Sequence, residues 1–284
     1  MLALACAIVT NLAFFCKQRG AALAPRVLAR HPWHSGRALF RVRWFAVGML
    51  IAALAWLLHV AAMALAPLSL VQVVLAGGIV LIGVMADRVF GFPVGRRQWL
   101  GLALTAAGLV AFALTVPAVR SAHATFSPAA MIAVEAALCG FGALLIVGPR
   151  AGAPLEHHGT MLGAASGILF GVSDISIKAL TGIVGAHGVF GLLSPWLALT
   201  LLASVVAFFA SAKSFQEGEA VPVIAITSAT ANISAIAGGI LVFGDPMPAG
   251  PLGLVAQGLG LVAILAAAAL MPSFSARHAA AAPA

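Results

Sequence analysis

The sequence is poor in charged residues. Only 8% of its 284 residues are charged and 63% are apolar, whereas soluble globular domains contain about 25% charged and about 45–50% apolar residues. A water-soluble fold cannot bury that much hydrocarbon. The composition therefore excludes a soluble globular protein and predicts a multi-pass membrane protein.

Acidic residues and cysteines are also few. Seven Asp and Glu stand against 15 Lys and Arg, which gives a net charge of +8. In a soluble protein this charge would suggest nucleic-acid binding, but here the basic residues lie between hydrophobic runs, where they act as topology signals. We therefore expect no nucleic-acid partner. Cys6, Cys16 and Cys139 lie inside apolar runs without CxxC or zinc-ligand spacing, which excludes a disulfide framework and a structural zinc site.

Nine apolar runs separate the clusters of charge, and most approach the roughly 20 residues that span a bilayer. They cover residues 1–16, 44–65, 68–85, 98–115, 128–147, 160–180, 190–211, 220–243 and 251–271. Continuous apolar runs are typical of membrane helices and not of membrane barrels. The sequence therefore predicts an all-α integral membrane protein with about nine transmembrane helices. Basic residues follow the first run instead of preceding it, so we expect no cleaved signal peptide.

The basic residues are distributed unevenly among the loops. With the N-terminus outside, 13 of the 15 Lys and Arg lie on the cytoplasmic side, and only Arg120 and Lys178 lie outside. This favours an N-out, C-in orientation in the cytoplasmic membrane. Segment 17–43 is strongly basic and is interrupted by Pro25 and Pro32, so it is expected either to lie on anionic headgroups or to form a solvated loop.

Short motifs recur along the chain at an offset of about 150 residues. Phe-Gly-Phe-Pro at 90–93 recurs as Phe-Gly-Asp-Pro at 243–246, and Gly108 matches Gly260. Lys17, which closes the first run, matches Lys178, which closes the sixth. These matches predict two four-helix units that are related by an internal repeat.

The repeat divides the chain into four parts: a first unit at 1–116, a spacer helix with its loops at 117–159, a second unit at 160–271, and a cytoplasmic tail at 272–284 that is expected to be disordered. An odd number of spacer spans turns the second unit over in the membrane. The result is an inverted 4+1+4 repeat, which is typical of alternating-access transporters.

These features resemble the drug/metabolite transporter superfamily. Residues 63–112, with Pro67, a glycine-rich third run and the pair Gly101 and Gly108, resemble the last half of a small multidrug resistance four-helix unit. The 4+1+4 order, the lysines at the helix ends and the turn at Pro67 are similar to NIPA-type magnesium transporters and to EamA-like proteins. The resemblance implies alternating access without a cofactor.

The membrane-embedded glutamate of the small multidrug resistance family has no counterpart in this chain. Val9 and Phe170 occupy the two matching positions. The resemblance therefore does not imply that family's proton and drug chemistry.

Several polar side chains inside the predicted spans are candidates for binding a substrate or an ion, because polar groups are costly in hydrocarbon. The candidate residues are His59, Gln72, Glu135, Asp174, Ser228, Asn232 and Gln257. At 1.5 Å per residue, five of the seven reach similar depths in the outer third of the membrane. They predict a hydrated cavity, and the alternative is that each satisfies only a neighbouring helix. Whether the site binds a metal stays open.

Two candidates have specific alternatives. Asp174 and Lys178 are four residues apart, so they either neutralise each other or leave Asp174 free for a ligand. Glu135 has no basic partner in its own run, and hydrocarbon favours a neutral carboxyl, so it is a candidate proton carrier.

Two helix faces are expected to pack or to bind. Gly163, Gly167 and Gly171 share one face of the sixth run and mark close packing. The eighth run contains two polar pairs with a spacing of four residues, Ser228 with Asn232 and Thr230 with Ser234. Each pair is expected either to face a cavity or to form hydrogen bonds across helices.

The sequence thus predicts a transporter of a small solute or cation, with proton coupling as an option. A non-transporting membrane scaffold and a NIPA-like magnesium transporter are the alternatives. The expected partners are the lipid bilayer and the transported molecule or ion, and a homodimer is also open. No Ser-His-Asp, HExxH or DxxD-like set occurs, so we expect neither an enzyme nor a cofactor.

Overall fold

The computed structural model describes residues 2–28, 31–89, 95–115, 125–245, 247–248 and 250–270. Most of these residues are helical, and none of them forms a strand. Five segments are long and apolar enough to cross a membrane: α3 (Arg43–Leu65), α7 (Pro128–Val147), α8 with the turn after it (Leu155–Leu193), α9 (Pro195–Glu217) and α10 (Ala220–Phe243). The protein is therefore an all-α membrane protein.

The structure contains six further α-helices among the described residues. They are α1 (Leu2–Ala22), α2 (Pro32–Arg41), α4 (Leu68–Gly77), α5 (Ile79–Arg88), α6 (Arg96–Thr115) and α11 (Pro251–Leu270), while α8 itself covers Leu155–His187 and 3-10 turns cover Gly148–Ala151 and Gly188–Leu193. Each predicted apolar run overlaps a helix, and α4 and α5 share the third run. The motif at 90–93, Arg120 and the tail at 272–284 lie outside the described residues.

Helix α1 is longer than the sequence predicted, because its basic end has partners. The prediction ended the helix at residue 16, but it continues to Ala22. The Lys17 Nζ lies 4.5 Å from the centre of the Phe14 ring, and the Arg19 guanidinium lies 4.7 Å from the Trp44 ring. Cation–π contacts of this kind allow the charges to stay on a helix that is otherwise apolar.

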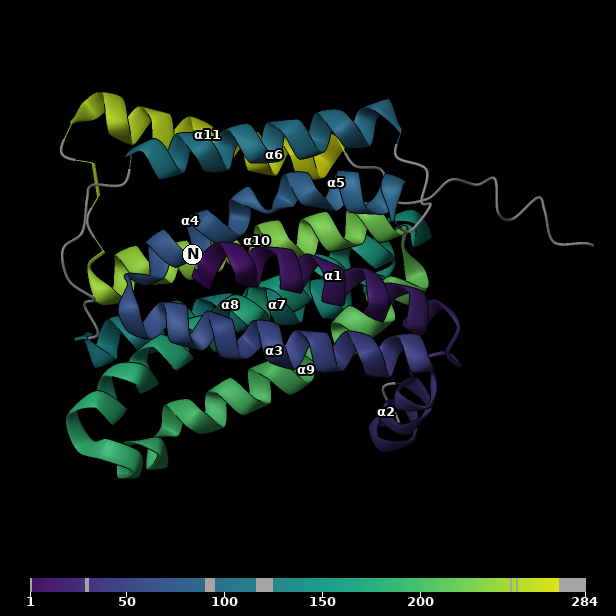
Figure 1. Ribbon diagram of the computed structural model, residues 1–284, viewed down its shortest axis with the longest axis horizontal. Coiled ribbons are helices and arrows are strands. Elements are labelled where there is room, and N and C mark those ends of the chain that lie inside the picture. The colour runs from purple at the N-terminus through teal and green to yellow at the C-terminus, as the bar shows by residue number, and fades with distance from the viewer. Residues whose placement is uncertain are drawn as a thin grey trace, which may run out of the picture.

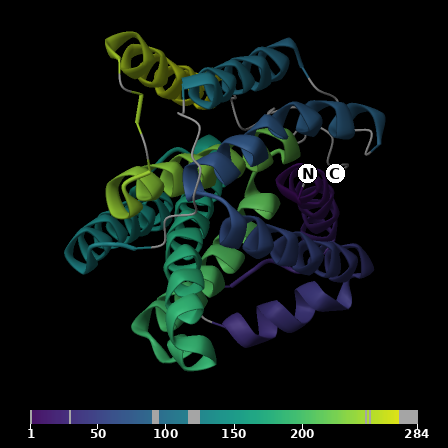
Figure 2. The same cartoon turned by 60° about the vertical axis from the view of Figure 1, so that its left-hand side comes forward.

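The helices form one bundle with an outlying pair (Figure 1). α1 packs along α3, α8 packs along both α9 and α10, and α7 packs on α8. α6 packs mainly along α11, and these two helices lie side by side at the edge of the bundle in both views (Figures 1 and 2). α1, α3, α4, α8 and α10 therefore surround the centre.

Helix α2 lies across one end of the bundle. Figure 1 looks nearly along the axis of α2, whereas the long helices lie in the plane of the picture; Figure 2, turned by 60°, shows α2 from the side. The buried Leu39 and a stack of Phe40 on Phe208, with ring centroids 6.2 Å apart, attach α2 to the bundle. Segment 17–43, which the sequence left as headgroup-bound or solvated, thus contains an ordered helix.

The third predicted run is broken at Gly78, between α4 and α5. A side chain at Gly78 would meet the Ala7 Cβ at 2.8 Å, so α1 approaches the backbone closely there. The Asn11 Nδ2 donates to the Gly78 carbonyl over 2.8 Å. Helix breaks commonly occur at glycines, and the Asn11 side chain satisfies a carbonyl at this break.

Helices α8 and α10 are in unusually close contact along the predicted glycine face. A Cβ at Gly163 would lie 3.1 Å from the Thr227 Oγ1, and one at Gly171 would lie 2.5 Å from the Ser234 Cβ. The Thr227 hydroxyl donates to the Gly163 carbonyl over 3.0 Å. The glycine face therefore packs against α10, as its spacing indicates.

Candidate functional site

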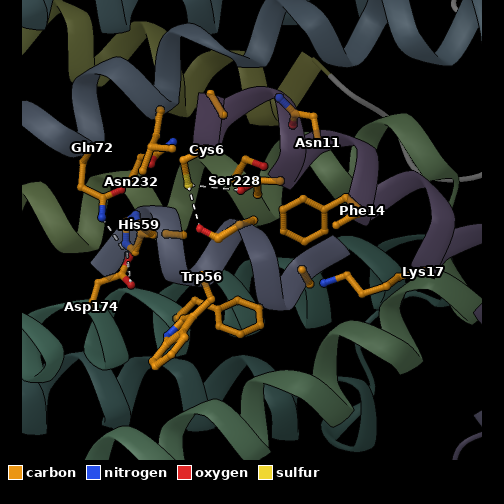
Figure 3. A pocket seen from close by; sticks show the side chains of 18 residues that line it. Cys6, Asn11, Phe14, Lys17, Trp56, His59, Gln72, Asp174, Ser228 and Asn232 are labelled. Carbon is orange, nitrogen blue, oxygen red and sulfur yellow. Dashed lines mark hydrogen bonds and ion pairs between the residues drawn. The ribbon is translucent and has the colours of Figure 1, made fainter. Parts of the chain in front are cut away.

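A cavity of about 200 Å³ lies at the centre of the bundle. Its lining comes from α1, α3 and α4 on one side and from α8 and α10 on the other (Figure 3). The polar and aromatic lining residues are Cys6, Thr10, Asn11, Phe14, Lys17, Trp56, His59, Gln72, Phe170, Asp174, Ser228 and Asn232. Five of the seven candidates named from the sequence are among them.

Asp174 links three helices at one end of the cavity. The His59 Nε2 of α3 lies 3.0 Å from its Oδ1, and the Gln72 Nε2 of α4 donates to its Oδ2 over 2.9 Å. Both carboxylate oxygens of Asp174, on α8, are therefore engaged by side chains from the first half of the chain. A network of this kind is stable only while its members stay paired.

Lys178 does not neutralise Asp174, although the two are four residues apart on α8. The Lys178 Nζ instead donates to the carbonyls of Met63 and Ala66, over 2.8 and 3.0 Å. These carbonyls belong to the end of α3, where helical backbone acceptors lack partners and a cation is favoured. The structure therefore has neither alternative that the spacing suggested, because Lys178 caps another helix and Asp174 is engaged by His59 and Gln72.

Asp245 binds the backbone on the α4 side of the turn between α3 and α4, whereas Lys178 binds it on the α3 side. Its Oδ2 accepts a hydrogen bond from the backbone N–H of Ser69, over 2.9 Å, in the first turn of α4. The chain reaches this point because Gly244, at a φ of 65°, ends α10 in the left-handed region. Oppositely charged side chains from the second half thus hold the turn between α3 and α4.

The opposite end of the bundle carries a similar arrangement. Gln216, near the end of α9, donates to the carbonyls of Ala21 and Pro25 over 3.0 Å each. Its Oε1 accepts from the backbone N–H of Val27 over 2.8 Å. A side chain of the second half again satisfies backbone groups of the first half, just beyond the end of α1.

Some polar residues of α10 face the cavity and others form hydrogen bonds to a neighbouring helix, the two roles that the sequence left open. Ser228 and Asn232 line the cavity. Thr230 instead donates to the Ala164 carbonyl of α8 over 3.1 Å. One line of the helix therefore contributes to the cavity and the neighbouring line to packing.

Glu135 lies outside the residues that line the cavity. It is buried on α7, and the Ser176 hydroxyl of α8 donates to its Oε1 over 2.6 Å. Its Oε2 has no hydrogen-bond partner among the described residues. Ser176 is two residues from Asp174, so Glu135 contacts the helix that carries Asp174 but not the space that Asp174 lines.

Gln257 is likewise buried but does not line the cavity. It lies on α11, which packs mainly on α6 and contacts the centre of the bundle only slightly. The position of Gln257 along its helix predicts its level along the membrane normal but not its position within the membrane plane.

The opposite end of the cavity contains residues that the sequence reasoning did not select. Lys17 and Phe14 lie there, while the Asp174 and His59 pair lies at the other end (Figure 3). Asn11 also lines the cavity and is buried. Asn11 is a polar residue inside an apolar run, so the reasoning that selected Gln72 and Asn232 applies to it as well.

Among the described residues, no group of three His, Cys, Asp or Glu side chains is placed to hold a metal ion. Comparison of the chain with protein-family models, with curated proteins and with solved structures gave no match. The assignment of a function therefore depends on the geometry of the cavity and on the sequence.

Proposed function

We propose that the protein is a membrane transporter that moves a small organic solute by alternating access. The observation that carries this proposal is the central cavity, which lies between the first and second halves of the chain and is bridged by Asp174. Polar groups around an internal cavity of a membrane protein are costly and indicate a substrate path. Moving the halves apart at one end exposes the cavity to that side.

We also propose that the chain spans the membrane nine times as an inverted 4+1+4 repeat of the drug/metabolite transporter superfamily. The packing is consistent with this: α1 lies along α3 as α8 lies along α9, and α6 pairs with α11. Gly108 and Gly260, which match in the repeat, are in contact, since a Cβ at Gly260 would lie 2.6 Å from the Gly108 carbonyl oxygen. In an inverted repeat, equivalent residues that lie near the pseudo-two-fold axis are expected to meet, so this contact supports the proposal.

The two capped ends supply the gates in this proposal. Lys178 and Asp245 hold the turn between α3 and α4 at one end, and Gln216 holds the end of α1 at the other. Each gate consists of side chains of the second half on backbone of the first half. Opening one end breaks one set of hydrogen bonds while the other set stays closed.

The orientation follows from the basic residues. With the N-terminus outside, 13 of the 15 Lys and Arg are cytoplasmic, which favours this orientation in the cytoplasmic membrane. The end that carries Gln216 is then the inner end, and the end that carries Lys178 is the outer end.

The lining favours an organic solute over a magnesium ion. Mg²⁺ is usually bound through one or two carboxylates and several waters, but both oxygens of Asp174 are engaged and Glu135 does not line the cavity. Trp56, Phe14 and Phe170 offer apolar surface, while Ser228 and Asn232 offer hydrogen bonds. This combination suits a small solute with an apolar body and polar groups.

Cysteine-accessibility labelling tests the transport proposal against a membrane scaffold. Asn232→Cys places a thiol on the cavity, and Thr227→Cys places a matched thiol on the same helix toward α8. Both changes are made in a protein whose native Cys6, Cys16 and Cys139 are replaced by alanine, because Cys6 itself lines the cavity. We expect a membrane-impermeant reagent to label the first variant from one side only, with a rate that a bound solute lowers, and not to label the second. Equal protection of both thiols in every condition would contradict transport.

A solute screen then identifies the substrate class. The purified protein is heated with metabolites, drugs and divalent cations, and ligands that raise its unfolding temperature are tested for uptake in proteoliposomes. We expect organic solutes and not Mg²⁺ to give the shifts. A shift with Mg²⁺ that Asp174→Asn removes would favour the magnesium alternative.

A further inference from the structure

The surface around α2 carries an unbalanced positive charge. Residues 17–43 contain seven Lys and Arg and no Asp or Glu. Arg26, Arg37, Arg41 and Arg43 are exposed, and none of the ion pairs between described residues includes them. These charges therefore face the surroundings of the protein and not an internal partner.

A groove runs beside these charges. A cavity of about 250 Å³ lies between residue 25 and α2 and is lined by Pro25, His34, Arg37, Ala38, Arg41 and Val42. A second cavity of about 340 Å³ adjoins it and shares His34 and Arg37. Arg37 and Arg41 are four residues apart, so they project from one face of the helix.

The groove is held in place from the side of the bundle. The Ser35 hydroxyl accepts a hydrogen bond from the Leu28 N–H over 3.0 Å, and Leu39 is fully buried. Gln216 fixes the backbone at Pro25, the other wall of the groove. The site is therefore formed before any ligand arrives, which lowers the entropic cost of binding.

The position of α2, across the end of the candidate membrane spans, favours the level of the lipid headgroups. The helix crosses the end of the long helices at a steep angle (Figures 1 and 2), and its Trp33 is 82% exposed. Tryptophan is enriched at membrane–water interfaces, and helices with basic and apolar faces lie in the interface plane.

We propose that this groove binds the headgroup of an anionic phospholipid. The guanidinium groups of Arg37 and Arg41 hold the phosphate, a geometry that arginine provides and lysine does not. Trp33 lies at the level of the glycerol and upper acyl region. Because Gln216 joins the groove wall to α9, a bound lipid stabilises this end of the bundle. The proposal holds whether or not the protein transports a solute.

The test compares two double variants of the full-length protein in nanodiscs. Arg37→Gln with Arg41→Gln removes the charges of the groove, and Arg96→Gln with Arg97→Gln removes two exposed charges from the start of α6 as the matched control. The discs contain phosphatidylcholine with or without phosphatidylglycerol. Native mass spectrometry counts retained lipid, and a thermal scan records the unfolding temperature.

We expect phosphatidylglycerol to bind and to raise the unfolding temperature of the wild-type protein and of the control. Unspecific attraction to an anionic membrane contributes about fivefold per basic side chain, so the control loses at most roughly 25-fold. The groove variant also loses the charge-assisted hydrogen bonds to the phosphate, so its loss exceeds that of the control. A third variant, Arg37→Lys with Arg41→Lys, keeps the charge and is expected to recover part of this loss. It also supplies the readout if the glutamine variant does not fold.

Three outcomes would overturn the proposal. The first is undiminished lipid binding by the groove variant, and the second is an equal loss in the control, which would indicate unspecific attraction. The third is stabilisation by inorganic phosphate in phosphatidylcholine discs equal to that by phosphatidylglycerol. That result would indicate a site for a soluble anion and not for a lipid.

Discussion

At the scale of single residues, Asp174 is the most connected group of the cavity. It is engaged by two side chains of the other half of the chain, His59 and Gln72. Its role is therefore double, since it both shapes the cavity and holds α3 and α4 against α8.

Replacing the Asp174 carboxylate, and an exposed carboxylate as a control, tests whether Asp174 contributes more than a surface charge does. Asp174→Asn keeps the size of the side chain but leaves only one acceptor for His59 and Gln72, so we expect a loss of about 1–3 kcal/mol in stability and weaker solute binding. Asp87→Asn removes a carboxylate that is 53% exposed and serves as the control. The unfolding temperature of both variants in detergent measures the difference; equal temperatures would mean that the bridge contributes nothing.

Glu135 allows a test of proton coupling at the same scale. Its position behind α8, hydrogen-bonded to Ser176, lets it respond to movement of α8 without touching the solute. We expect Glu135→Gln to fold and to bind solute normally, because it does not line the cavity, but to lose uptake driven by a pH gradient in proteoliposomes. If uptake persists unchanged, Glu135 is a packing residue.

The candidate residues were predicted from the sequence because polar side chains are costly to place in hydrocarbon. Polar groups in apolar runs are few, and Asp174, His59 and Gln72 are indeed gathered around one cavity. Sequence reasoning could not separate Glu135 and Gln257 from them, because depth along a helix contains no information on azimuth. The partner of Lys178 was also out of reach, because it is a backbone carbonyl of another helix, and backbone groups have no sequence signature.

At the scale of helices, the contact between α8 and α10 limits what the chain can vary. Gly167 lies against Thr230 and the backbone of α10, so an added methyl group would overlap both. Gly185, on the same helix, has no atom within 4 Å of the corresponding position.

These two glycines form a matched pair for mutagenesis. We expect Gly167→Ala to destabilise the protein by about 1–3 kcal/mol, as overpacking does, and Gly185→Ala to leave stability unchanged or to raise it by up to about 1 kcal/mol through helix propensity. Chemical or thermal unfolding in detergent compares them. Equal stability of the two variants would show that the helices can separate without cost.

Helix positions were largely accessible from the sequence. The runs at 128–147 and 220–243 coincide with α7 and α10, since Pro128 begins one helix and Gly244 ends the other. The break at Gly78 was missed because an apolar run reads as continuous whether or not its axis bends. The end of α1 was also wrong, because aromatic rings accommodate its charges.

For the whole molecule, the distribution of basic residues makes a prediction that needs no knowledge of the substrate. The orientation that places 13 of the 15 Lys and Arg inside predicts a cytoplasmic C-terminus. We expect a fluorescent protein fused after Ala284 to fluoresce and alkaline phosphatase fused at the same residue to be inactive, because the second needs an oxidising exterior. The reverse pattern would invert the assignment of inner and outer gates.

The Lys178 cap has a consequence for how the protein is made. The carbonyl of Ala66 receives its hydrogen bond from a residue 112 positions later in the chain. At a synthesis rate of about 5–20 residues per second, roughly 6–22 s pass before that lysine leaves the ribosome. During this interval the carbonyls of Met63 and Ala66 lack the donor that they have in the finished fold, so the turn between α3 and α4 completes its hydrogen bonds only after the second half has been made.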